Sequence, residues 1–137
     1  MSDCLFCKII AGEIPAHKVY EDDKVFAFLD IHPVNPGHAL VIAKNHAGNL
    51  EESKTEDVCA IMAVIHKLAP KILKAVGAEA FNLGLNNGRD AGQIVPHLHF
   101  HIMPRFPGDG HALWHGQSAE KDELAEIAKK IRKEPRT

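Results

Sequence analysis

The chain has almost no net charge, no long apolar run and no signal-peptide pattern in its first residues, and each of these absences argues against a class of protein. Its 16 basic and 18 acidic residues leave a formal charge of −2, which argues against a protein that wraps nucleic acid or adheres to a membrane surface. No apolar stretch approaches the roughly 20 residues of a membrane-spanning helix, and the first residues lack the basic start and apolar core of a signal peptide. We therefore expect a cytoplasmic protein that binds neither nucleic acid nor membranes.

Cysteine is also scarce. The three residues Cys4, Cys7 and Cys59 are an odd set and a poor basis for a disulfide framework. In a reducing compartment, a Cys-x-x-Cys pair such as Cys4 and Cys7 more often indicates metal or redox chemistry. No second such pair follows, so a zinc ribbon lacks ligands, and the surrounding pattern does not offer the βαβ context of a redox pair. On their own, the two cysteines indicate only half of a metal site.

Short strands and turns are predicted in the first half of the chain. Residues 24–30 and 38–43 have strand patterns, and the turn-rich segment 33–37 lies between them. Ser53 and Glu56 then have the spacing of a capping box, in which Ser53 would be the N-cap. The sequence therefore predicts a helix that begins directly after Ser53.

The second half alternates helix and strand patterns. Apolar residues at helical spacing follow the capping box and stop before Gly77, a natural helix end. A further strand is predicted over 80–86, a loop over 87–92 and a short amphipathic helix around 124–131. With the histidine-rich strand near residue 99, the order β-β-β-α-β-β-α indicates an α+β fold with an antiparallel sheet.

Histidine is abundant, with ten residues, and three of them stand at alternate positions, His97, His99 and His101. Side chains on a strand alternate between faces, so these three imidazoles should share one face. One metal ion cannot bind all three, because the outer two would lie roughly 13 Å apart while zinc bonds are roughly 2 Å long. The strict spacing of two residues argues against histidines placed by chance at the surface or in the core. Because one metal ion cannot bind all three, we expect the three histidines to have different roles.

Neighbouring imidazoles beside a glycine-containing loop suit phosphorus chemistry. Imidazole titrates near neutrality, so it can act as a neutral nucleophile or as a proton donor. The loop that ends at Gly92 and Gln93 can offer backbone N–H groups to phosphate oxygens. Together these features fit attack by one histidine on phosphorus, followed by hydrolysis of the covalent intermediate.

The chain resembles the histidine triad (HIT) family of nucleotide hydrolases and transferases, in particular its bacterial zinc-containing members. The family signature is His-φ-His-φ-His-φ-φ, where φ is apolar, and residues 97–103 match it at every position. Four further segments are similar to family members, namely 6–10, 28–30, 35–38 and 92–95. The resemblance covers about residues 4–105.

This resemblance implies a fold and an assembly. It implies a five-stranded antiparallel sheet with one long helix and a short C-terminal helix, within a single domain over residues 1–137. The core would occupy about residues 4–105, and residues 106–137 would form a C-terminal loop and helix. Members of the family usually form symmetric homodimers, so we expect this chain to pair as well.

The resemblance also implies roles for individual residues. His99 would attack the α-phosphate of a purine nucleoside phosphoramidate or adenylated species and form a nucleotidyl-histidine intermediate. His101 would contact the phosphate and the leaving group, His38 would support the triad, and Asp30 would bind the ribose hydroxyls of AMP or GMP. The other implied substrate contacts are the apolar walls around the base, Phe6, Ile9, Ile14, Phe28 and Ile31, and the phosphate-side residues Asn86, Gly92, Gln93 and Ile94.

Bacterial members with the same cysteine pair complete a metal site with two histidines. The resemblance places these at His46 and His97, next to Cys4 and Cys7 in space. Two thiolates and two imidazoles would form a closed tetrahedral zinc site, which is structural. No cofactor would be needed for the chemistry itself.

Several functions remain open at this point. Ile94 stands where the phosphoramidase branch often has a serine, so the leaving group is open between phosphoramidates, adenylated species and dinucleoside polyphosphates. A nucleotide-binding regulatory module with little turnover is a further alternative. The last is a zinc-binding scaffold in which the histidine triad is only structural.

Overall fold

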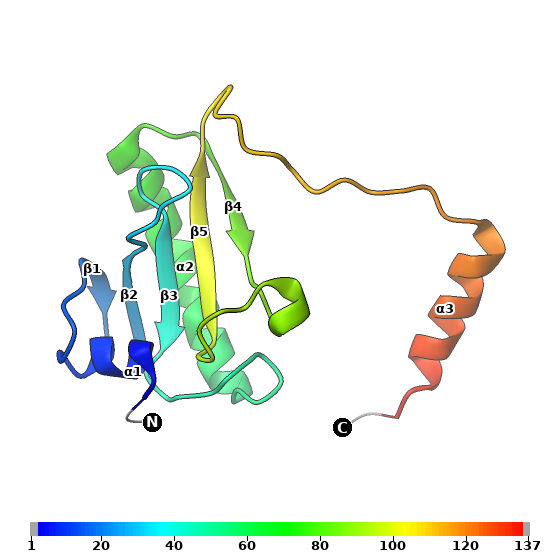
Figure 1. Cartoon of the computed structure of the whole chain (residues 1–137), viewed down its shortest axis with the longest axis horizontal. Helices are drawn as coiled ribbons and strands as arrows, with labels where there is room; N and C mark the ends of the chain where they lie inside the picture. The colour runs from blue at the N-terminus through cyan, green and yellow to red at the C-terminus, as the bar shows by residue number, and fades with distance from the viewer. Residues whose placement is uncertain (1–2, 136–137) are drawn as a thin grey trace.

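The structure, a computed structural model, describes residues 3–135 and is built on a five-stranded antiparallel sheet in the order β1-β2-β3-β5-β4 (Figure 1). The strands are β1 (Lys18–Glu21), β2 (Val25–Leu29), β3 (Ala39–Ala43), β4 (Ala80–Gly84) and β5 (His99–Arg105). The helices are α1 (Leu5–Ile10), α2 (Thr55–Val76), α3 (Lys121–Lys133) and the short 3-10 helix η1 (Arg89–Ala91). The predicted α+β fold with an antiparallel sheet, one long helix and a short C-terminal helix is thus confirmed.

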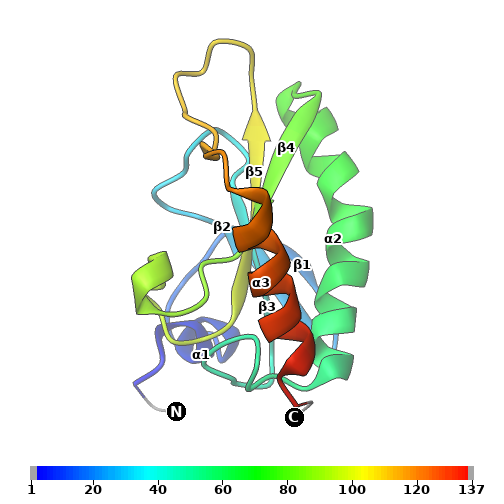
Figure 2. The same cartoon turned by 90° about the vertical axis from the view of Figure 1, so that its right-hand side faces the viewer.

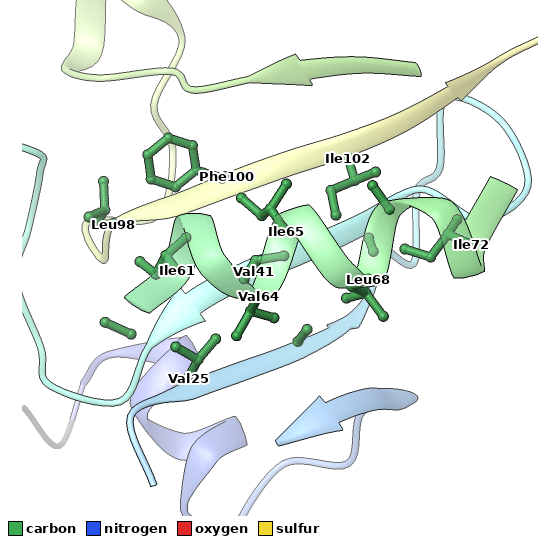
Figure 3. Close-up of a cluster of buried hydrophobic side chains, with 14 residues drawn as sticks. Val25, Val41, Ile61, Val64, Ile65, Leu68, Ile72, Leu98, Phe100 and Ile102 are labelled. Atoms are coloured by element: carbon green, nitrogen blue, oxygen red, sulfur yellow. The ribbon is translucent and has the colours of Figure 1, made fainter. Parts of the chain in front are cut away.

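Helices α1 and α2 cover opposite faces of the sheet (Figure 2). The long helix α2 packs Ile61, Ile65 and Leu68 against apolar residues of β2, β3 and β5 (Figure 3). On the other face, α1 contributes Phe6 and Ile9 to a second apolar cluster. Burial of apolar surface on both faces stabilises the central strands, and β3 is buried along its whole length.

The start of α2 differs from the prediction. Its N-cap is Lys54, which makes no side-chain capping hydrogen bond, so the prediction of Ser53 as the N-cap was wrong. The Ser53 hydroxyl instead donates to the Asn49 carbonyl oxygen at 2.8 Å, which closes the turn before the helix. The predicted stop is confirmed, because Gly77 ends the helix in the left-handed conformation with φ of 75°.

The histidine strand also begins later than predicted. β5 starts at His99, so His97 lies outside the strand. The backbone N–H of His97 donates to Val95 at 2.9 Å and that of Leu98 to Ala47 at 2.8 Å, which leaves neither group free for the sheet ladder. Leu98 nevertheless packs in the α2-facing core with the apolar residues of β5.

The C-terminal part of the chain extends away from the sheet. Residues 106–120 contain no helix or strand, and α3 follows at a distance from the sheet (Figure 1). Its apolar side chains Leu124, Ile127 and Ile131 are exposed. Trp114, in the preceding segment, is 95% exposed. None of the helices within residues 3–135 is long and apolar enough to cross a membrane.

Candidate active site and metal centre

β5 places two of the predicted catalytic histidines on the face opposite α2. His99 and His101 alternate with Phe100 and Ile102, which are buried in the core beneath α2. The rings of His99 and His101 lie 5.0 Å apart between centroids. The strand therefore brings these two imidazoles together as predicted.

His99 is held in one tautomer by the backbone. Its Nδ1 lies 2.8 Å from the His97 carbonyl oxygen, which only accepts hydrogen bonds. Nδ1 must therefore carry a proton, and in the neutral ring Nε2 carries the lone pair. Burial lowers the pKa of His99 below its ordinary value, so the ring is neutral near pH 7. An unprotonated Nε2 is the form that can attack phosphorus.

His38 and His101 have the complementary arrangement. The Val34 backbone N–H donates to His38 Nδ1 at 3.0 Å, so the proton of neutral His38 is on Nε2. This Nε2 lies 2.9 Å from His101 Nδ1 and donates to it. His101 is then left with its proton on Nε2. His99 thus presents a lone pair, while its neighbour His101 presents an N–H group.

Burial keeps both His38 and His101 neutral. Burial lowers the pKa of His38, and the carboxylate of Asp30 opposes this only partly. Burial, together with His99 and His38, lowers the pKa of His101 to about 4. Asp30 Oδ2 lies 3.6 Å from His38 Nε2, while Oδ1 accepts the backbone N–H of His32 at 2.8 Å. Asp30 therefore closes a local turn and also faces the histidine cluster.

Most of the predicted apolar walls gather beside His99. Phe6 and Phe28 are buried and meet edge to face with ring centroids 5.4 Å apart. Phe6 also meets the His99 ring edge to face at 5.0 Å. Ile9 belongs to the same cluster and Ile14 packs against it. The fifth residue of the predicted set, Ile31, is 77% exposed and lies outside this cluster.

The loop before β5 is held together by its own side chains. The Gln93 amide oxygen accepts the Gly88 backbone N–H at 2.8 Å, and its nitrogen donates to Gly48 and Val95 at 2.7 and 3.0 Å. Both amide hydrogens of Gln93 are thus used within the protein, so its amide stabilises the loop and has no N–H left for a phosphate. Gly92 has φ of 93°, a conformation that favours glycine.

Two other residues of the predicted phosphate side are accessible. Asn86 lines a cavity of about 670 Å³ together with His38 and His101. Ile94 is 92% exposed at the surface of the loop. Asn86 is therefore placed beside the supporting histidines, whereas Ile94 makes no wall of this cavity.

This cavity was not predicted from the sequence. Its floor includes Asn82 and Gly84 of β4 and Met103 of β5, on the same face of the sheet as His101. Residues 111–114 of the extended C-terminal segment form another wall. The cavity thus opens next to His101, on the side of the triad away from Phe6 and α1.

An ion pair anchors the C-terminal segment at this cavity. Asp109 accepts hydrogen bonds from Arg105 Nε and Nη2 at 2.8 and 2.9 Å and from the Asn35 amide at 2.9 Å. Arg105 Nη2 also donates to the His111 carbonyl oxygen at 2.7 Å. The neighbouring guanidinium holds the pKa of Asp109 well below its usual range. The spacing of Arg105 and Asp109 is the only signal for this anchor in the sequence.

The four predicted metal ligands meet at one point. The ligand atoms of Cys4, Cys7, His46 and His97 all lie within 4.8 Å of one another. Nδ1 of His97 lies 3.3 Å from Cys4 Sγ, 3.6 Å from Cys7 Sγ and 3.2 Å from His46 Nδ1. A tetrahedral zinc site with ordinary bond lengths has ligand atoms roughly 3.3–3.8 Å apart. The spacing of this donor set therefore fits zinc.

The hydrogen-bond partner of His97 agrees with this role. Its Nε2 donates to the Ala43 carbonyl oxygen at 2.9 Å, which leaves the Nδ1 lone pair directed at the cysteines. Burial and the adjacent Cys4 thiol raise the pKa of Cys7 to about 11. A pair of thiolates at this position therefore needs a bound cation to neutralise its charge.

A second group of potential ligands does not fit a metal. Asp30, His38 and His101 also have donor atoms within 4.8 Å of one another. His38 Nε2 carries a proton, however, because its Nδ1 accepts the Val34 N–H. The nitrogen that faces the cluster is therefore not available to a cation, and this group is arranged for proton contacts.

Comparison with known proteins identifies similar sequences over most of the chain. Residues 11–108 match the family model described as the HIT domain. An uncharacterised HIT-like protein of Methanocaldococcus jannaschii is 46% identical over 129 residues, covering 94% of this chain and 98% of that protein. An adenosine 5′-monophosphoramidase of Schizosaccharomyces pombe is 40% identical over 131 residues, covering 93% of this chain and 95% of that enzyme.

Solved structures have the same fold. A protein from Streptococcus mutans superposes with a TM-score of 0.92 at 43% identity, over 97% of this chain and 85% of its own. A zinc-bound histidine triad family protein from Mycobacterium smegmatis superposes with a TM-score of 0.76 at 33% identity, over 97% of this chain and 99% of its own. The sequence comparison and the structure comparison therefore both identify histidine triad proteins.

The lowered pKa of His101 predicts how the free energy of unfolding depends on pH. Because the pKa of His101 is lowered to about 4, the unfolded chain binds more protons than the folded chain between that pH and about 6.5. The free energy of unfolding should therefore fall as the pH drops through this window. Urea unfolding at several pH values should show a shallower fall for His101→Asn, whereas His66→Asn, at an exposed position of α2, should match wild type. Equal pH slopes for wild type and His101→Asn would contradict the assignment.

Proposed function

The chain belongs to the histidine triad (HIT) family, and we propose that it is a hydrolase of purine nucleoside phosphoramidates or adenylated species. The observation that carries the proposal is the pairing of complementary tautomers on β5. His99 Nε2 has a free lone pair, and His101 Nε2 has a hydrogen to donate. The relationship to an adenosine 5′-monophosphoramidase supports the same substrate class.

In the proposed reaction, His99 Nε2 attacks the α-phosphorus of the bound nucleotide. The bond from phosphorus to nitrogen forms as the bond to the leaving group breaks, giving a nucleotidyl-histidine. The His101 Nε2–H donates to the leaving atom or to a phosphate oxygen and stabilises the charge that develops there. Water then attacks the same phosphorus, releases AMP or GMP and restores neutral His99. His38 keeps the proton of His101 on the side of the substrate.

The surrounding residues suit a purine nucleotide. Phe6 and Phe28 offer an apolar wall for the base, with Ile9 and Ile14 behind them, and Ile31 would close the rim. The partly exposed carboxylate of Asp30 would accept hydrogen bonds from the ribose hydroxyls. The phosphate would lie near Asn86 and the backbone N–H groups around Gly92 and Ile94, in a loop that Gln93 stabilises.

A second candidate substrate follows from the cavity beside His101. Its volume of about 670 Å³ leaves room for a leaving group much larger than ammonia. Ile94, in place of a branch-specific serine, offers no hydroxyl to a small leaving group. Dinucleoside polyphosphates are therefore the alternative substrate class, cleaved by the same attack of His99.

A substrate panel tests the activity and the nucleophile together. Wild type should hydrolyse adenosine phosphoramidate with a higher kcat/KM than diadenosine polyphosphates, and the reverse order would select the alternative. His99→Ala should lose roughly 1,000-fold or more of kcat/KM because the attacking atom is gone. The matched control His66→Ala, at an exposed position on α2, should keep full activity. Full activity in His99→Ala would refute the nucleophile, and binding of AMP without turnover of either substrate would indicate a regulatory module.

We also propose that Cys4, Cys7, His46 and His97 hold a structural zinc ion. The spacing of their donor atoms and the zinc-bound relative from Mycobacterium smegmatis support this assignment. Zinc would neutralise the two thiolates and tie α1 to the start of the histidine strand. The site lacks an open position, so zinc takes no part in the reaction. Reduced cysteines at this site also suit the cytoplasmic location that we propose.

Metal analysis tests the zinc site. Purified wild type should contain zinc in a stoichiometric amount, whereas Cys4→Ser/Cys7→Ser should contain almost none because both thiolate ligands are lost. Cys59→Ser is the matched control, since Cys59 is exposed on α2, away from the ligand cluster. Equal zinc content in wild type and the double variant would refute the site.

Finally, we propose that the chain forms a homodimer. β4 pairs with β5 on one side only, so its outer edge offers free backbone groups within the described residues. Phe81 on this edge is 37% exposed. The apolar side chains of α3 and the indole of Trp114 are also exposed, and a second copy would cover them.

Light scattering after size exclusion tests the dimer. Wild type should have twice the 15.1 kDa mass of one chain. Phe81→Glu should shift the protein toward the monomer, because it introduces like charges at the joined β4 edges. Val19→Glu, at a 39% exposed position on the opposite edge strand β1, should remain dimeric. A monomeric wild type would refute the proposal.

A further inference from the structure

The metal cluster and the nucleophile share one residue. His97 directs its side-chain Nδ1 at the cysteines, while its backbone carbonyl oxygen accepts the hydrogen of His99 Nδ1 at 2.8 Å. The carbonyl direction decides whether His99 keeps its proton on Nδ1. The conformation of a proposed zinc ligand thus determines which nitrogen of the nucleophile carries the lone pair.

The peptide unit that contains this carbonyl is framed by the same cluster. Its N–H, which belongs to Leu98, donates to the carbonyl oxygen of Ala47 at 2.8 Å. Ala47 directly follows the proposed ligand His46. On the other side, His97 Nε2 donates to the Ala43 carbonyl oxygen at 2.9 Å. Movement of His46 or His97 would therefore turn this peptide unit.

A second link runs through α1. Phe6 lies between Cys4 and Cys7 in the sequence, on the helix that begins at the cluster. Its ring meets His97 at 5.9 Å and His99 at 5.0 Å between centroids, in both cases edge to face. The two cysteines therefore influence His99 in two ways, through its packing contact with Phe6 and through its hydrogen bond to the His97 carbonyl oxygen.

We infer that the metal centre positions the nucleophile, holding His99 in its reactive tautomer through the His97 carbonyl and in its ring orientation through Phe6. The inference rests on the proposed function, in which His99 attacks phosphorus and zinc occupies the four-residue cluster. His97 and Phe6 are positioning residues. In metal sites generally, losing a hydrogen bond between a ligand residue and its partner changes activity by about 10- to 100-fold, and the bond between His97 and His99 is of this kind.

Without the metal, the cysteines and His46 lose the common partner that holds them together. The His97 carbonyl then loses part of its support, and neutral His99 can take the other tautomer, with its hydrogen on Nε2. A ring in that tautomer presents no lone pair to the α-phosphorus. Loss of the metal should therefore lower kcat more than it raises KM, since the nucleotide still has Phe28 and Asp30 to bind.

Nitrogen NMR of the imidazole rings tests this inference in the full chain. Two-bond ¹H–¹⁵N correlations, assigned with His99→Gln, report which nitrogen carries the hydrogen in zinc-loaded, chelated and zinc-reloaded protein. We expect His99 in a single Nδ1–H tautomer when loaded, a mixture of tautomers when stripped, and recovery after reloading. The kcat for adenosine phosphoramidate should fall about 10-fold or more on stripping.

His46→Gln removes one ligand and leaves both cysteines in place, so it decides the question if chelation unfolds the chain. It should reproduce the mixed tautomers and the lower kcat, whereas Cys59→Ser should behave as wild type. A folded, zinc-free protein that keeps the single tautomer and the wild-type kcat would overturn the inference and leave the proposed function intact. A zinc-loaded wild type that cleaves no nucleotide would instead refute the proposed function, while the tautomer comparison would still judge the inference.

Discussion

Everything in the site depends on the two-residue alternation of β5. Phe100 and Ile102 point into the core beneath α2, where they are buried (Figure 3). His99 and His101 must then point to the opposite face, because the pleat of a strand allows no other arrangement. A shift of one residue in the strand register would exchange the two sets and place imidazoles in the apolar core. The packing of α2 against Phe100 and Ile102 thus determines which face of the sheet carries His99 and His101.

Two backbone groups convert this row of similar rings into distinct chemical groups. A carbonyl oxygen can only accept and an N–H can only donate, so His97 and Val34 determine the proton positions of His99 and His38. His38 then determines that of His101. The side chains are chemically identical, and their roles come from the backbone groups beside them. The same reasoning separates the cluster that suits zinc from the one that does not.

The sequence predicted what depends on local periodicity and missed what depends on distant contacts. The strands around 24–30 and 38–43 and the helix stop at Gly77 were confirmed, since apolar alternation and a left-handed glycine are local properties. The pattern of alternate histidines suggested that His97 belonged to the strand. The backbone N–H of His97 instead donates to Val95 and that of Leu98 to Ala47, and only the fold brings Ala47 to that position.

The candidate site divides in the same way. The resemblance brought together the four cysteine and histidine residues of the cluster and the pair on β5, and the structure places both sets within contact distance. The resemblance did not predict that the Gln93 amide stabilises the loop, because its hydrogen bonds to Gly48 and Gly88 depend on the folded structure. The hydrogen bonds between Arg105 and Asp109 were not predicted either, because they hold a segment without helix or strand, and such a segment has no periodic sequence pattern.

The Arg105–Asp109 ion pair holds a cavity wall that is separate from the proposed base-binding residues. The proposed wall for the base comes from α1 and β2, on one side of His99, while the cavity beside His101 is bounded by β4 and by residues 111–114. Changes in the C-terminal segment would therefore alter the size of the cavity beside His101 without moving Phe6, Phe28 or the proposed nucleophile His99. In the proposed function, attack would depend on residues of the central sheet, whereas the choice of leaving group would depend on a segment that the Arg105–Asp109 ion pair holds at its surface. On the proposed function, substitutions in residues 111–114 would therefore change leaving-group preference in this chain while His99 remained the attacking group.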